Sequence, residues 1–473
     1  MKALLNRLQY LLGPIIFLVI LFSPLEIEQD AQQFLAIFSL VISLWLFTDV
    51  PLFISGILGV TLSVILGVVK PIEAFSSFAD PIIFLFLGGF LLAKALEITE
   101  LDKRLAYKAL SHNFVQGSPQ RIVLAFLSLS FVLSMWISNT AAVAMLLPLT
   151  FGVLKNLKDS YGIDDPQLSE HLLLGLAYSA TVGGNVTPIG SPPNIIAIGH
   201  LKNLVGIEIG FLQWMVMALP ISLIVFVYIY KRTVSKIPKN TILKNIEEVE
   251  NYKDLTKNQK NVIVIFSLTV FFWIIPNFLT LALPAQSSFS LFLKNNISAP
   301  IVGIFFASLL FLLPFSSSKK ILTSKDTSQI DWPALLLFGS GLSLGKILFK
   351  TGLSGHFSSW IIQMTGATGT LSLIVGIVFF TILFTELASN TASANIIIPI
   401  MIAFSKDTGT NPLVIIFVLA IACNSAYMLP VATPPNIIVY GTNKITKSTM
   451  VSAGFGINIL CAFILSLIIV ILV

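Results

Sequence analysis

Two polar triplets of the same composition interrupt apolar sequence in this chain. Ser138-Asn139-Thr140 lies between two short apolar runs, and Ser389-Asn390-Thr391 occupies a similar setting 251 residues later. The preceding residues keep this offset, since Ser134 corresponds to Thr385. One such triplet is usually a helix cap, but two in the same register indicate an internal repeat. Serine, threonine and asparagine offer neutral oxygens to a hard cation and hydrogen-bond donors to an anion.

A second pair of segments follows the triplets. The stretch from Pro188 to Ile196 reads PIGSPPNII, and the stretch from Pro430 to Ile438 reads PVATPPNII, at an offset of 242 residues. Proline breaks a helix, and backbone groups freed at membrane depth need other partners. The carbonyls that end one half-helix suit a cation, and the N–H groups that begin the next suit an anion. Repeated, broken apolar segments are typical of secondary transporters.

The composition places the chain in a lipid bilayer. It has 473 residues, of which 56% are hydrophobic and 11% charged, and its mean hydropathy is +0.92. We therefore expect an all-α polytopic membrane protein. The net charge of +6 comes from Lys and Arg between apolar runs, as the positive-inside rule predicts, so no nucleic-acid partner is expected.

The metal-binding residue types are too scattered for a zinc or calcium site. The histidines are expected to be solvated or interfacial, and both cysteines lie in apolar stretches. Sodium is the cation that suits the neutral oxygens of the triplets. An enzyme would need a nucleophile with a base or a pair of acidic groups, which the broken segments lack. A channel remains an alternative, which saturable, sodium-stimulated uptake would exclude.

The apolar runs predict about eleven transmembrane helices and two re-entrant helical hairpins. The hairpins are expected over residues 121–158 and 371–404. The crossings are expected near residues 10–25, 33–48, 51–69, 81–96, 171–202, 212–230, 261–281, 300–315, 333–350, 412–443 and 451–472, with the fifth and tenth broken.

Charges between these runs predict the orientation and the domains. Lys2 and Arg7 favour a cytoplasmic N-terminus, and the helix count then leaves the C-terminus external. The second repeat enters the membrane in the opposite sense, so the two repeats are inverted. The expected parts are N-terminal helices (1–50), a first inverted repeat (51–230), a cytoplasmic linker (231–260) and a second inverted repeat with a C-terminal helix (261–473). A bacterial inner (plasma) membrane suits the short termini.

These motifs resemble the divalent anion/sodium symporter (DASS) family, which includes sodium-coupled dicarboxylate, citrate and sulfate carriers. Both triplets match, as does the stretch from Asn424 to Gly441, NSAYMLPVATPPNIIVYG. The resemblance implies sodium-coupled symport of a C4-type dicarboxylate (succinate, malate or fumarate), an elevator-type alternating-access mechanism and a homodimer. The alternatives are a sodium symporter for sulfate or another inorganic divalent anion, and a sodium-independent dicarboxylate exchanger.

The resemblance also implies the binding residues. One sodium site would use Ser134, Ser138, Asn139 and the Gly190 carbonyl, and the other Thr385, Asn390 and the carbonyls of Ala388 and Ala432. The substrate would contact Asn139, Thr140, Ser191, Asn390, Thr391, Thr433 and Pro434.

A few residues depart from this pattern or lie beside it. The family commonly has glycine where Ala432 stands, so substrate preference could differ. Glu386 follows Thr385, but its counterpart Met135 is uncharged. We therefore expect Glu386 to orient the hairpin and not to bind the ion. Lys94 and Lys346 correspond to each other near helix ends and are also placed outside the site.

Overall fold

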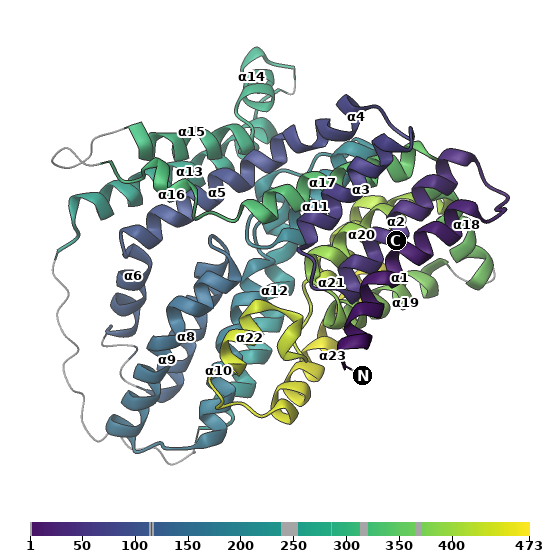
Figure 1. Cartoon of the computed structure of the whole chain (residues 1–473). Coiled ribbons are helices and arrows are strands. Elements are labelled where there is room, and N and C mark those ends of the chain that lie inside the picture. Colours follow the sequence, from purple (N-terminus) through teal and green to yellow (C-terminus); the bar gives the residue numbers. More distant parts are fainter. Residues whose placement is uncertain are drawn as a thin grey trace.

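The part of the chain that the structure describes is helical throughout. This computed structural model describes residues 2–112, 115, 118–237, 254–284, 286–312, 320–365 and 370–473, and no strand occurs in these ranges. Most of the expected cytoplasmic linker, 231–260, lies outside the described residues. Figure 1 shows the helices packed in one assembly, with the two termini on the same side of the view.

The first half of the chain contains the N-terminal helices and the first repeat. Its helices are α1 (Lys2–Phe22), α2 (Gln29–Phe47), α3 (Leu52–Ile65), α4 (Pro71–Ser76), η1 (Ser77–Ala79), α5 (Pro81–Ile98), α6 (Leu101–Leu110), α8 (Pro119–Ser134), α9 (Asn139–Tyr161), α10 (Pro166–Gly184), α11 (Pro192–Val205) and α12 (Phe211–Val234).

The second half repeats this order. Its helices are α13 (Lys257–Ala282), α14 (Ser288–Asn296), α15 (Ala299–Leu312), α16 (Ser324–Thr327), α17 (Trp332–Lys350), α18 (Leu353–Thr365), α19 (Thr370–Leu387), α20 (Asn390–Thr408), α21 (Pro412–Cys423), η2 (Pro430–Ala432), α22 (Pro434–Tyr440) and α23 (Lys447–Leu472). The helices α8 to α12 correspond in order to α19 to α23, so the repeat seen in the sequence is also a repeat of elements.

Equivalent helices begin with the same local chemistry. Asp80 caps α5 by accepting a hydrogen bond from the Ile82 N–H at 3.0 Å, and Asp331 caps α17. Asp165 caps α10 and Asn411 caps α21 in the same way, each directly before a proline. A short oxygen acceptor followed by proline at the first turn is a strong helix start.

Within the described ranges, eight helices are long and apolar enough to cross a membrane, or nine if α14 and α15 form one span bent by 65°. The expectation of eleven crossings also counted shorter and broken helices, such as α3 and α21. Helix α14 lies between two expected crossings, 261–281 and 300–315, and was not predicted. The protein is an integral membrane protein with an all-helical fold.

Glycines allow the closest helix contacts. A Cβ atom on Gly88 of α5 would stand 2.6 Å from the Gly303 carbonyl carbon of α15, so neither helix could keep its place. On α17, a Cβ atom on Gly339 would overlap the Phe78 ring. The glycines of the two equivalent helices α5 and α17 therefore serve close packing.

Candidate substrate and cation site

The first triplet forms the junction between α8 and α9. Ser138 caps α9, because its Oγ accepts a hydrogen bond from the Ala141 N–H at 3.2 Å. The buried Ser134 Oγ donates to Asn139 Oδ1. This contact brings two of the predicted sodium ligands together at the junction.

The first break lies between α10 and α11 and is held by side chains. Asn194 is fully buried, and its Nδ2 donates to the carbonyls of Gly184 at 2.9 Å and Thr187 at 2.8 Å. Thr187 Oγ1 donates to the Met135 carbonyl beside the first triplet, and the Gly190 N–H donates to Thr187 Oγ1 at 3.1 Å. Protein side chains thereby pair carbonyls that the break frees from helical hydrogen bonds.

Break and junction meet at Gly184. A Cβ atom there would stand 2.9 Å from Asn139 Nδ2 and closer still to Oδ1. A Cβ atom on Gly190 would stand 2.6 Å from the Gly184 carbonyl oxygen. The structure therefore brings Ser134, Asn139 and Gly190 together around Gly184. Ser138 adjoins them as the cap of α9.

The second junction, between α19 and α20, follows the same plan. Ser389 caps α20 by accepting a hydrogen bond from the Ala392 N–H at 3.3 Å. Thr385 Oγ1 lies 2.8 Å from Asn390 Oδ1 and 2.6 Å from the Cys423 carbonyl oxygen. A hydroxyl has one proton, so it can be donated to only one of these two oxygens. Three oxygens with one proton among them form an electron-rich cluster that suits a hard cation.

The second break, from α21 to α22, is held by two side chains. Asn436 is fully buried, and its Nδ2 donates to the Leu429 carbonyl at 3.0 Å. It corresponds to Asn194 of the first repeat. Glu386 is buried and accepts hydrogen bonds from this break. Ala388 and Ala432 are both buried, and η2, which ends at Ala432, packs against α19.

The two breaks are joined to each other by a buried polar bridge. Asn424 Nδ2 donates to Asn194 Oδ1 at 2.9 Å, and Ser191 Oγ donates to Asn424 Oδ1 at 2.6 Å. Helices also cross between repeats, since α9 packs on α22 and α20 packs on α11. Both candidate cation sites are therefore parts of one assembly built from both repeats.

The remaining predicted substrate residues are less closely joined. Thr140 is exposed, Thr391 is half-buried and Pro434 is exposed at the start of α22. Thr433 is buried, and its Oγ1 has no hydrogen-bond partner within the described part of the chain. No hydrogen bond between described residues joins Thr140 or Thr391 to the opposite junction.

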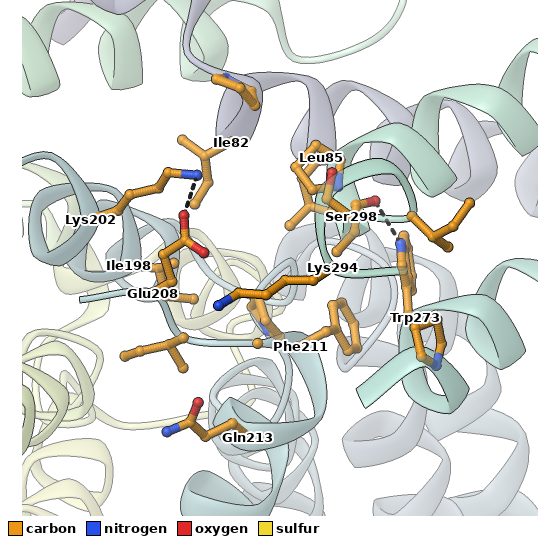
Figure 2. A pocket seen from close by; sticks show the side chains of 18 of the residues that line it. Ile82, Leu85, Ile198, Lys202, Glu208, Phe211, Gln213, Trp273, Lys294 and Ser298 are labelled. Carbon is orange, nitrogen blue, oxygen red and sulfur yellow. Dashed lines mark hydrogen bonds and ion pairs between the residues drawn. The ribbon is translucent and has the colours of Figure 1, made fainter. Parts of the chain in front are cut away.

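A cavity of about 510 Å³ lies beside the first break. Pro188 of the break lines it, together with residues of α5, α11, α12, α13 and the α14–α15 region. Figure 2 shows Lys202, Glu208 and Lys294 around it, with Lys202 and Glu208 paired at 2.9 Å. The lining contains two acids, because Asp80 also contributes, and two lysines. The cavity therefore has no net charge to attract an anion.

One histidine is not where the sequence was expected to place it. His200 is fully buried and both ring nitrogens lack a hydrogen-bond partner among the described residues. It packs against Gly345 of α17, where a Cβ atom would stand 2.8 Å from Nδ1. The expectation of a solvated or interfacial side chain is wrong here, because a glycine on the facing helix makes room for the ring.

Sequence reasoning missed the residues that hold the breaks together. Asn194 and Asn436 had a signal, because each follows a proline pair in the same register of its repeat. Asn424 begins the stretch that matches the family signature, but its partners Ser191 and Asn194 could not be inferred from it. Thr187 had no signal, since the Met135 carbonyl that it contacts lies 52 residues away. No cluster of three or more histidine, cysteine or acidic residues was found across the described ranges.

Comparisons with known proteins agree with this architecture. A sodium-dependent dicarboxylate transporter, SdcS, of Staphylococcus saprophyticus is 33% identical over 98% of this chain and 90% of the relative. SdcS of Staphylococcus aureus is 33% identical over 97% of this chain and 89% of the relative. The solved structure of the Alcanivorax borkumensis YdaH transporter has a similar fold, with a TM-score of 0.54, 9% identity and coverage of 99% of this chain and 96% of that one. The family model described as the sodium:sulfate symporter transmembrane region matches residues 4–472, so the chain belongs to this family of divalent anion/sodium symporters and is a transporter, not an enzyme.

Proposed function

We propose that this protein is a sodium-coupled symporter of a C4-type dicarboxylate such as succinate, malate or fumarate. The relatives, which are named as sodium-dependent dicarboxylate transporters, support the substrate class and the coupling ion. The observation that carries the proposal is the oxygen cluster of Thr385, Asn390 and Cys423, where lone pairs outnumber protons. Sodium, a hard cation that takes oxygen ligands, would complete it.

Each cation site would combine one junction with its own break. The first would use Ser134, Ser138, Asn139 and the carbonyl of Gly190. The second would use Thr385, Asn390 and the carbonyls of Ala388 and Ala432. Neutral ligands hold sodium weakly enough for release, which a carrier requires. The contact of Gly184 with Asn139 and the packing of η2 on α19 support these groupings.

The dianion would lie between the two junctions. Helices α9 and α20 begin there, and their free N–H groups and positive dipole ends favour carboxylates. Asn139 and Thr140 would bind one carboxylate, and Asn390 and Thr391 the other. Ser191, Thr433 and Pro434 would shape the pocket. Sodium at each junction would add positive charge beside the substrate, which couples the two binding events.

The finer architecture is part of the same proposal. The pairs α8–α9 and α19–α20 would be re-entrant hairpins entering from opposite sides, among about eleven crossings. Inverted repeats at 51–230 and 261–473 would follow N-terminal helices at 1–50 and flank the linker 231–260. The N-terminus would be cytoplasmic and the C-terminus external in a bacterial plasma membrane. A homodimer with elevator-type motion would provide alternating access.

Sulfate is the second candidate substrate, because the description of the matching family names sodium:sulfate symporters. Sulfate and succinate are both dianions, so the same donors and cations would serve either. They differ in the distance between their charges. A site that uses one asparagine from each junction favours the longer dicarboxylate, whose two charged ends could meet the two junctions separately.

The test is uptake of labelled succinate into proteoliposomes, driven by an inward sodium gradient and compared with potassium. Unlabelled malate, citrate and sulfate serve as competitors. Accumulation that requires sodium and is inhibited by malate supports the proposal. Inhibition by sulfate alone would favour sodium-coupled sulfate symport, the second candidate. Counterflow that ignores sodium would establish an exchanger and contradict both cation sites.

Variants connect the uptake to the site. Asn139→Ala and Asn390→Ala should each abolish sodium-driven uptake, because each removes both a cation ligand and a substrate donor. Asn443→Gly is the matched control. Asn443 is exposed and has a positive φ of 56°, so glycine removes a carboxamide there without backbone strain. Equal activity of all three variants would contradict the assignment.

A further inference from the structure

Glu386 is a buried carboxylate that four donors surround. Its side chain lies at the end of α19, and the residue is only 4% exposed. Oε1 accepts the N–H groups of Tyr427 at 2.7 Å and Met428 at 2.8 Å, and Oε2 accepts the N–H of Leu429 at 3.0 Å. The fourth donor is Asn458 Nδ2 of α23, at 2.7 Å from Oε1.

The three backbone donors belong to a segment that has no regular structure of its own. Residues 424–429 connect α21 to η2, and consecutive N–H groups there point at one acceptor. An ionised carboxylate is the side chain that suits them, because it only accepts hydrogen bonds and has about four lone-pair sites. Hydrogen bonds to a charged acceptor are also stronger than those between neutral groups.

The carboxylate joins the two elements that would supply the second cation site. Glu386 adjoins Thr385, whose hydroxyl lies in the oxygen cluster. The segment it holds runs directly into η2, which ends at Ala432. Fixing residues 427–429 to the end of α19 therefore fixes where the Ala432 carbonyl lies relative to Thr385 and Asn390.

In the first repeat, the break is attached to the junction without a charged side chain. Met135 stands where Glu386 stands in the second repeat. There too the break donates and the junction accepts, but the groups are neutral, since Thr187 Oγ1 in the break donates to the Met135 carbonyl at the junction. One break is thus tied to its junction by three backbone N–H groups on a carboxylate, and the other by one neutral hydroxyl.

We propose that Glu386 is the positioning residue of the second cation site, and that it makes the two sites unequal in sodium affinity. This inference rests on the proposed sodium symport. The carboxylate holds the break in its ligating position before sodium arrives, and its negative charge favours a cation nearby. The second site therefore fills at lower sodium than the first, whose break is tied to its junction only by the neutral Thr187 hydroxyl.

The test compares the sodium dependence of the wild type with that of Glu386→Gln. Glutamine keeps the size of the side chain, but its one oxygen and its NH₂ group place a donor against a donor. The sodium concentration for half-maximal uptake should rise about tenfold, the equivalent of one strong hydrogen bond. The succinate KM at saturating sodium should stay within about twofold.

A second measurement does not depend on transport. The thermal midpoint of each purified protein is followed as sodium is added without substrate, and the sodium needed for half of the stabilisation is read. Glu386→Gln should shift this value upward by the same factor as in uptake. Thr187→Val is the matched variant of the first break. It should leave sodium binding at the second, higher-affinity site unchanged and weaken sodium binding at the first site.

The outcomes separate the inference from the function. If the wild type responds to sodium and Glu386→Gln has the same sodium midpoint, the positioning role is wrong. If KM and the sodium midpoint rise together, Glu386 is merely structural. If neither uptake nor the thermal midpoint of the wild type depends on sodium, the proposed sodium symport itself is wrong. Should Glu386→Gln not fold, Asn458→Leu removes one of the four donors and must give a smaller shift in the same direction, or the inference fails.

Discussion

Replacement of Gly184 by alanine tests the site at its tightest contact. The added Cβ atom would stand 2.9 Å from Asn139 Nδ2 and 3.0 Å from Cγ, whereas relaxed contacts are about 3.5 to 4.0 Å. The Asn139 carboxamide must therefore retreat by about 1 Å. Because this group is the end of a flexible side chain, the fold should survive while the ligand is displaced.

The expected loss of activity is large for so small a change. A misplacement of about 1 Å in a binding or reacting group can cost roughly 100-fold. Sodium-driven succinate uptake by Gly184→Ala in proteoliposomes should fall by about that factor, with a thermal midpoint close to that of the wild type. The control is Gly152→Ala in α9, where no described atom lies within 4 Å of the new methyl group. If both variants transport equally well, Asn139 is not a ligand in the position described.

Four further perturbations have defined outcomes. Asn194→Leu leaves two carbonyls and one amide unpaired, at a cost of about 1 to 3 kcal/mol each, so the thermal midpoint in detergent should fall strongly. An unchanged midpoint would contradict the buried bridge between Asn194 and Asn424. Gly345→Ala should destabilise by about 1 to 3 kcal/mol because the buried His200 ring cannot move, whereas Gly355→Ala, with no described atom nearby, should not. Lys350→Gln breaks an exposed ion pair of 2.6 Å with Glu73, so the free energy of unfolding from the same thermal measurement should change by less than about 1 kcal/mol. Replacing sodium by choline should lower the thermal midpoint, since an ion at 100 times its Kd contributes about 2.7 kcal/mol, and a midpoint independent of sodium would argue against either cation site.

The sequence predicted the repeat and the breaks because both depend on local chemistry. Clustered prolines and glycines favour helix boundaries, and the structure has such boundaries at Gly184, Pro192 and Pro434, whereas the isolated Pro148 and Pro399 lie inside helices. Capping residues act within one turn, so the triplets were recognisable as helix starts. The comparisons confirm the family that these motifs indicated. The sodium and substrate ligands stay predictions.

Contacts between distant segments could not be predicted in this way. The bridge from Asn424 to Asn194 spans 230 residues, and no periodicity in the sequence relates the two side chains. Helix α14 is short and polar at its end, so it has no transmembrane signal. The burial of His200 depends on Gly345 of another helix, and a glycine in an apolar run does not reveal what packs against it.

The two repeats show which features the backbone imposes and which it leaves free. Both contain a junction capped by serine, and both contain a break whose carbonyls pair with an asparagine after two prolines. Backbone geometry demands these features, so they recur. The tie between break and junction is different in each, a hydroxyl from Thr187 in one and a carboxylate from Glu386 in the other. Any tie that satisfies the freed groups preserves the fold, so sequence change at this tie can alter cation affinity without disturbing the shared architecture.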